Sequence, residues 1–126
     1  MCIYAAVALA GPRVVAAAEA LTQYQENLVY LDYAERASLH CRRVGVETGA
    51  LFEAWAVERA RVRTAAEDAL RAAAHLAIHD PAEAEIFLSD AAVRRLAQAD
   101  QLIANNGVPC NAFSKWLTLI AQLIRD

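Results

Sequence analysis

Residues 13–44 read RVVAAAEALTQYQENLVYLDYAERASLHCRRV, a stretch that contains neither glycine nor proline. Apolar side chains recur along it at spacings of three and four, which places them on one face of an amphipathic helix. The stripe drifts round the helix, because 3.6 residues per turn do not match a strict repeat of 3.5. Its members are Val14, Ala17, Leu21, Tyr24, Leu28, Leu31, Ala34, Ala37, Cys41 and Val44. The pattern predicts a helix of about 30 residues, roughly 45 Å long.

Breaks in this pattern divide the rest of the chain. Gly45 and Gly49 bracket a reversal, with Thr48 as candidate N-cap. The sequence Asp80-Pro81-Ala82-Glu83 predicts an N-cap, a first helical residue and a capping-box partner. The expected stripes are Leu51, Trp55, Val62, Ala65, Ala69, Ala73 and Leu76, then Ile86, Val93, Leu96, Ala97 and Ile103, then Phe113, Trp116, Leu117, Ile120, Leu123 and Ile124.

These signals predict an all-α fold, an antiparallel helical bundle of four main helices. Two are long (about 13–44 and 50–79), one is medium (81–104) and one is short (111–125). The 126 residues and 13.7 kDa fit a single domain, 1–126. Three prolines and four glycines leave little turn chemistry for an all-β fold, and the abundant alanine favours helix.

A reversal centred near Glu47 would place opposite charges across the two long helices. It sets Glu35 opposite Arg59 and Arg36 opposite Glu58. Charges at a helix–helix seam fix the register of the helices at some cost in stability. The alternative is that all four charges flank the seam and are solvated.

The charge balance indicates that nucleic acid is not the partner. The formal net charge is −3, whereas nucleic-acid binders carry clustered lysine and arginine. The one basic concentration contains Arg59, Arg63, Glu67 and Arg71 at four-residue spacing, which predicts a ladder of ion pairs along one helix. No apolar run is long enough to span a bilayer, so we expect no membrane insertion.

The opening residues 1–10, MCIYAAVALA, are all apolar. They resemble the apolar part of a signal peptide but lack a preceding positive charge, which favours a packed helical turn. Cys2, Cys41 and Cys110 are widely separated and form no CxxC motif. We interpret them as small buried apolar residues in a reducing compartment, and we expect a cytoplasmic protein without a disulfide framework.

His75 and His79 lie four residues apart on a predicted helix, and Asp80 follows. Imidazoles at this spacing share a face and can converge on one metal ion, but no third ligand stands at motif spacing. Alternatively, the two histidines interact with the last carbonyls of the helix. A metal- or small-molecule-binding bundle that uses His75 and His79 is the alternative function.

The sequence contains no arrangement of nucleophile, histidine and carboxylate at motif spacing, and no glycine-rich phosphate loop. We therefore predict that the chain is not an enzyme and needs no cofactor. The apolar residues exceed what one seam against two short helices should need, which favours association with a partner helix. The sequence predicts a small interaction protein (adaptor, chaperone or regulator), a homodimer that acts through helix–helix packing.

The residues expected at the partner interface are aromatic and aliphatic. Tyrosine is favoured where one end of a side chain stays in water. The alternative for the four C-terminal members is ordinary core, and helix 111–125 would either close its own bundle or exchange with a partner. The set comprises Tyr30, Tyr33, Trp116, Leu117, Ile120 and Ile124.

Overall fold

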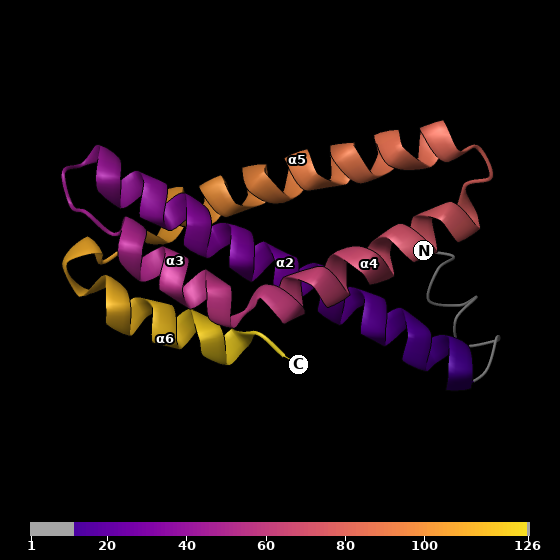
Figure 1. Cartoon of the computed structure of the whole chain (residues 1–126), viewed down its shortest axis with the longest axis horizontal. Coiled ribbons are helices and arrows are strands. Elements are labelled where there is room, and N and C mark those ends of the chain that lie inside the picture. Colours follow the sequence, from indigo (N-terminus) through magenta and orange to yellow (C-terminus); the bar gives the residue numbers. More distant parts are fainter. Residues whose placement is uncertain (1–11, 126) are drawn as a thin grey trace.

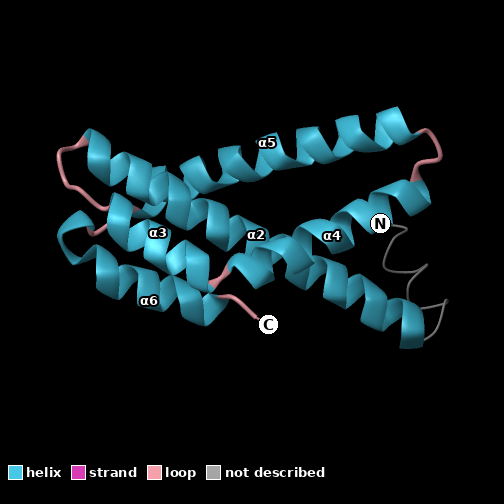
Figure 2. Cartoon of the chain, viewed as in Figure 1, coloured by secondary structure: helices cyan, strands magenta, loops and turns pink. Residues whose placement is uncertain are grey.

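The computed structural model describes residues 12–125, and every regular element among them is helical (Figure 2). The predicted all-α fold is therefore confirmed. The elements are α2 (Pro12–Arg43), α3 (Gly49–Glu58), α4 (Ala60–Ala77), α5 (Pro81–Asn106), the 3₁₀ turn η1 (Cys110–Ala112) and α6 (Phe113–Leu123).

Helix α2 is the centre of the molecule, because it packs against α3, α4, α5 and α6 (Figure 1). Its C-terminal half is flanked by α3 and α6, which lie against each other. The α4–α5 hairpin extends toward the other end of the molecule, and there it diverges from α2. α4 runs antiparallel to both α2 and α5, so α2 and α5 run in the same direction.

The predicted second long helix is broken at Arg59, which separates α3 from α4. The Arg59 N–H bonds to Ala56 O instead of to Trp55 O four residues back. The Arg59 guanidinium donates to the Trp55 carbonyl in its place, at 2.9 Å. A side chain that replaces a backbone bond in this way is a recognised cause of helix kinks. The break lets α3 pack on α6 while α4 follows α2.

The core follows the predicted stripe of α2 closely from its middle onward. Leu28, Leu31, Ala34, Ala37 and Cys41 are all buried. Val44 lies past the end of α2 and is exposed. The stripe positions 14 and 17 lie outside the residues whose side chains the structure describes.

On the α4–α5 hairpin the predicted stripes are partly wrong. Leu76, Ile86 and Val93 are exposed, whereas the buried positions there are alanines, including Ala84 and Ala99. Alanine has no bulk beyond Cβ, so Ala-lined faces can approach closely and leave the larger side chains outside. The periodicity correctly indicated helices but not which face of each was buried.

The helix ends largely match their sequence signals. Asp80 caps α5 and accepts from the Ala82 N–H at 2.9 Å, and Pro81 is the first helical residue. Among the described residues, Glu83 makes no reciprocal bond to Asp80. Gly107 ends α5 at φ 70°, a conformation that favours glycine.

The reversal between α2 and α3 lies where the two glycines predicted it, with Gly45 at φ 91°. Thr48 occupies the N-cap position of α3, but its side chain makes no capping bond. The buried Thr48 hydroxyl donates to the Ser38 carbonyl at 3.1 Å and contacts the Ser38 hydroxyl at 2.8 Å. The Glu47 carboxylate accepts from the Gly49 N–H instead.

Candidate functional site

Most of the predicted interface residues lie in the core of this chain. Tyr33, Trp116, Leu117 and Ile120 are buried, and they therefore do not form a free surface on the monomer. The ring of Tyr33 meets Trp116 edge-on, with centroids 5.1 Å apart. Burial also raises the pKa of the Tyr33 hydroxyl.

The remaining two predicted interface residues, Tyr30 and Ile124, are partly buried against the same core. Within this chain, helix α6 packs against α2 and α3. Trp116 stacks on Phe113, and the Leu117 carbonyl accepts a hydrogen bond from the Trp55 indole at 3.0 Å. The aromatic residues near the C-terminus thus serve the fold.

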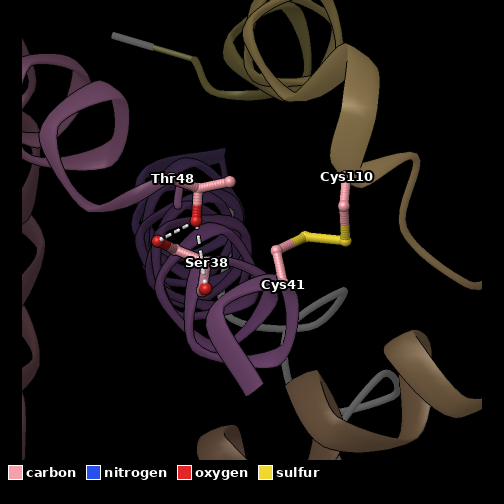
Figure 3. Close-up of a disulfide and its surroundings, with 4 residues drawn as sticks. All are labelled: Ser38, Cys41, Thr48 and Cys110. Carbon is pink, nitrogen blue, oxygen red and sulfur yellow. Dashed lines mark hydrogen bonds between the residues drawn. A yellow bond between two sulfur atoms is a disulfide. The ribbon is translucent and has the colours of Figure 1, made fainter. Parts of the chain in front are cut away.

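Cys41 and Cys110 form a disulfide, contrary to the expectation of unpaired cysteines (Figure 3). Their Cα atoms lie 5.4 Å apart, although 69 residues separate them in sequence. Figure 3 shows the bond linking the end of α2 to the segment before α6, beside the hydroxyls of Ser38 and Thr48. Sequence spacing contained no signal for it, because α5 must run the length of the bundle before Cys110 returns to Cys41. Cys2 lies outside the described residues.

The predicted metal ligands are not gathered into a site in the part of the chain that the structure describes. His75 Nε2 lies 2.6 Å from Glu85 Oε2, and Arg71 also binds Glu85. These contacts, the Arg71 bond first, hold the pKa of the Glu85 carboxyl below its ordinary value. Asp80 is engaged as N-cap. Within residues 12–125, no three His, Cys, Asp or Glu side chains are arranged to bind a metal ion.

The seam between α2 and α4 carries a charge layer, but not the predicted one. Buried Asp32 accepts from Arg63 at 3.1 Å, and Arg95 of α5 lies 3.5 Å from its other oxygen. The Asp32–Arg63 pair is displaced by one residue from the predicted register. The observed pair is thus close to the predicted alignment of the two helices, but it is formed by different charged residues.

The predicted partners of that layer are elsewhere. Arg36 binds Asp100 of α5 through two bonds of 2.8 Å, which lower the pKa of the Asp100 carboxyl. Glu58 contacts the adjacent Arg59 at 3.4 Å, and Glu35 is exposed. The predicted pairs of Glu35 with Arg59 and of Arg36 with Glu58 are therefore wrong.

The predicted ion-pair ladder along residues 59–71 is also wrong. The Arg59 guanidinium lies over the Trp55 ring, 4.4 Å from its centroid. Arg63 reaches across to Asp32 on α2, and Arg71 reaches across to Glu85 on α5. These arginines connect helices instead of lining one solvated face.

A hollow with a mainly apolar lining lies between the α4–α5 hairpin and the first half of α2. We call it the α2–α4–α5 groove; its volume is about 590 Å³. Ten of its fourteen lining residues are apolar. These are Leu21, Val29, Leu70, Ala73, Ala74, Ala77, Ile78, Phe87, Leu88 and Ala91, and the polar ones are Gln25, Arg94, Arg95 and Gln98.

Large apolar side chains are exposed around the same hairpin. Leu76 is 83% exposed, Ile86 62%, Val93 65% and Phe87 49%. Ile86 and Val93 lie seven residues apart and so share one face of α5, while Phe87 lines the groove. Periodicity predicts Ile86, Val93 and Leu76 in the core and leaves Phe87 outside the stripe, whereas the structure exposes the first three. The predicted stripe contains Ile86, and the adjacent Phe87 points in a different direction because neighbouring helical residues do not share a face.

Compared with protein families, with curated proteins and with solved structures, the chain shows no match. Among the described residues, none of the helices combines the length and the apolar character needed to cross a bilayer.

Proposed function

We infer that this chain is a helical interaction protein that forms a homodimer by packing helices at the α2–α4–α5 groove. The observation that carries the inference is the groove itself, apolar over most of its lining and open beside the half-exposed ring of Phe87. Exposed apolar surface of this kind marks sites of association, and a groove between helices suits an amphipathic helix. The classes adaptor, chaperone and regulator all act through such contacts.

The test measures the mass of the protein in solution by light scattering over a range of concentrations, with metal assayed in the same tube. We expect metal-free protein at twice 13.7 kDa at the upper concentrations. A monomer that carries stoichiometric zinc or iron would contradict the proposal and support the His75/His79 alternative.

Two matched variants assign the dimer to its surface. Phe87→Asp places a charge in the groove, and Leu119→Asp places the same charge on α6, where Leu119 is 58% exposed and outside the groove. We expect Phe87→Asp to weaken the dimer at least about tenfold, because a buried unpaired charge is costly. Leu119→Asp should dimerise as the parent does. The reverse order of effects would place the interface on α6.

The cytoplasmic location remains a prediction. Unpaired cysteines no longer support it, because Cys41 and Cys110 are bonded to each other. Disulfides persist mainly in oxidising compartments. Trapping the thiols of the protein inside intact cells would show whether the bond exists there.

A further inference from the structure

The α2–α4–α5 groove has the size and the lining of a small-molecule site. Its volume of about 590 Å³ lies within the range of ligand pockets, roughly 300–1,000 Å³. Such pockets combine a mainly apolar lining with a few polar groups that orient the ligand. Ten of the fourteen described lining residues are apolar, and none of the fourteen is acidic. The lining therefore favours a ligand that is largely apolar and carries no positive charge.

The charged groups of the groove are gathered at one end of a single face of α5. The lining residues on this face follow helical spacing, three apolar ones first and three polar ones farther from the α4–α5 turn: Phe87, Leu88, Ala91, Arg94, Arg95 and Gln98. The face extends about 16 Å at 1.5 Å per residue. The fourth polar lining residue, Gln25 of α2, is uncharged and exposed, so its amide can remain in water. A ligand lying along α5 would thus meet apolar side chains first and arginine at its far end.

Arg94 supplies a positive charge that no carboxylate of the described residues neutralises. Its side chain is exposed, it lines the groove, and none of the ion pairs within residues 12–125 includes it. A guanidinium presents its N–H groups in a planar fork that matches the two oxygens of a carboxylate. Arg94 is therefore available to bind the acidic head of a ligand.

The adjacent Arg95 adds positive charge that is only partly balanced. Its Nε atom lies 3.5 Å from one oxygen of Asp32, while the other oxygen of Asp32 accepts from Arg63 at 3.1 Å. One carboxylate thus serves two guanidinium groups. The Arg95 Nε is also buried without a hydrogen-bond partner among the described residues, which is unfavourable for a donor. This end of the groove has an excess of both positive charge and hydrogen-bond donors.

We propose that the α2–α4–α5 groove binds a fatty acid, with the alkyl chain along Phe87, Leu88 and Ala91 and the carboxylate at Arg94. Burial of the alkyl chain is favourable in proportion to the apolar area removed from water. The charge-assisted hydrogen bonds of the carboxylate fix the direction in which the ligand lies. This binding does not depend on the proposed function. Competition between the fatty acid and a second copy for the groove does rest on it.

Isothermal titration calorimetry of the full chain tests the charge preference with two soluble amphiphiles of similar chain length. Decanoate carries a negative head and decyltrimethylammonium a positive one. We expect decanoate to bind at least about tenfold more tightly. The net charge of −3 disfavours an anion, so a preference in this direction requires local positive charge. Equal affinities, or tighter binding of the cation, would overturn the proposal.

A series of carboxylates tests whether the alkyl chain is buried. From hexanoate to octanoate to decanoate, we expect affinity to rise about tenfold for each two CH₂ groups that leave water. An affinity that does not change with chain length would show that only the head group binds, and it would contradict the proposed site.

A matched pair of variants locates the head group. Arg94→Glu reverses the charge in the groove, and Arg61→Glu makes the same change at an exposed position of α4 outside it. Both side chains are exposed, so both variants should fold, as circular dichroism would verify. We expect Arg94→Glu to weaken decanoate binding at least about fivefold, in keeping with an exposed ion pair, and Arg61→Glu to retain it. Equal losses would mean that overall charge, not the groove, attracts the anion.

A second matched pair locates the alkyl chain. Ala91→Trp places a large ring in the middle of the apolar lining, and Ala97→Trp places it on an exposed part of α5 outside the groove. We expect only Ala91→Trp to weaken decanoate binding, by at least about tenfold, because the ring takes the space of the chain. Unchanged binding in a folded Ala91→Trp variant would exclude the groove as the site.

The remaining outcomes separate this inference from the proposed function and from membrane binding. Light scattering of the same samples reports the oligomeric state. A chain that binds decanoate but never dimerises would support the fatty-acid site while the dimer proposal fails. A dimer that binds no decanoate would do the reverse. Binding to phosphatidylglycerol vesicles without binding of free decanoate would also overturn the site, since the arginines would then recognise a lipid surface.

Discussion

The indole N–H of Trp55 donates to the backbone carbonyl of Leu117 at 3.0 Å, and this bond joins α3 to α6 in the core. The two residues are 62 positions apart in sequence. Trp55 is in place to make the bond because α3 ends at Glu58 instead of continuing into α4. The break at Arg59 therefore allows α3 to pack against α6.

Replacing Trp55 by phenylalanine should lower the free energy of unfolding more than the same replacement of Trp116. Both rings are buried to a similar degree, so the loss of packing is comparable. The additional loss at Trp55, about 1 kcal/mol, is the net contribution of a typical hydrogen bond. Urea denaturation of both variants measures the difference; equal losses would show that the bond adds nothing to stability.

Reduction of the Cys41–Cys110 disulfide should lower the free energy of unfolding by about 2–4 kcal/mol, because the bond closes a long loop in the unfolded chain. Denaturation with and without reductant measures the change. A thiol titration of the unreduced, unfolded protein should find one free thiol per chain. Three free thiols would show that the bond does not form.

Asp32→Asn should destabilise the fold by about 2–4 kcal/mol, because it leaves Arg63 and Arg95 without their shared buried carboxylate. Glu85→Gln removes an exposed carboxylate from Arg71 and His75 and should have a clearly smaller effect. Thermal unfolding of both variants provides the comparison. A larger loss at Glu85 would mean that the α4–α5 pair, not the α2–α4 seam, stabilises the bundle.

Acid should destabilise the protein partly through Asp100. The bonds from Arg36 hold the pKa of the Asp100 carboxyl below its ordinary value. A carboxyl whose pKa is lower in the folded state than in the unfolded state stabilises the folded protein. This stabilisation is fully present when the pH is above the unfolded-state pKa, about 3.9 for aspartate. That stability is lost as the pH falls through the lower folded value.

Asp100→Asn should therefore reduce stability at pH 7 and flatten its decline below about pH 4. Urea midpoints from pH 7 to pH 3 measure this. Asp90→Asn is the control, since Asp90 is exposed on the same helix and forms no ion pair among the described residues. An unchanged decline in Asp100→Asn would exclude this carboxylate as a source of acid sensitivity.

Local signals predicted the helices well. The ends of α5 show this: the helix was predicted over 81–104 from its Asp80-Pro81 start and its glycine stop, and it spans Pro81–Asn106 with Gly107 as its C-cap. The break at Arg59 was not predictable in this way, because no glycine or proline marks it. The break depends on the Arg59 guanidinium, which binds the Trp55 carbonyl and lies over the Trp55 ring. These contacts form only when the surrounding helices are packed.

Packing between helices also decides where two of the candidate interface residues lie. The preference of aromatic residues for interfaces predicts Tyr33 and Trp116 at a surface, but the fold packs them against each other in the core. Phe87 lies outside the predicted stripe of its helix and lines the groove. Periodicity shows that a helix has an apolar face, but in Ala-rich helices it does not show which face the neighbours cover.

The sequence by itself determined the helical class, the reversal at residues 45–49 and the ends of α5 at Asp80 and Gly107. These properties depend on backbone propensity, caps and chain length, which act between residues close in sequence. Only the tertiary structure decided the Cys41–Cys110 bond, the pairing of Asp32 with Arg63 and the open α2–α4–α5 groove. The two bonded pairs join residues at least 31 positions apart, and the groove lies between α2 and the α4–α5 hairpin, so each feature depends on how whole helices pack.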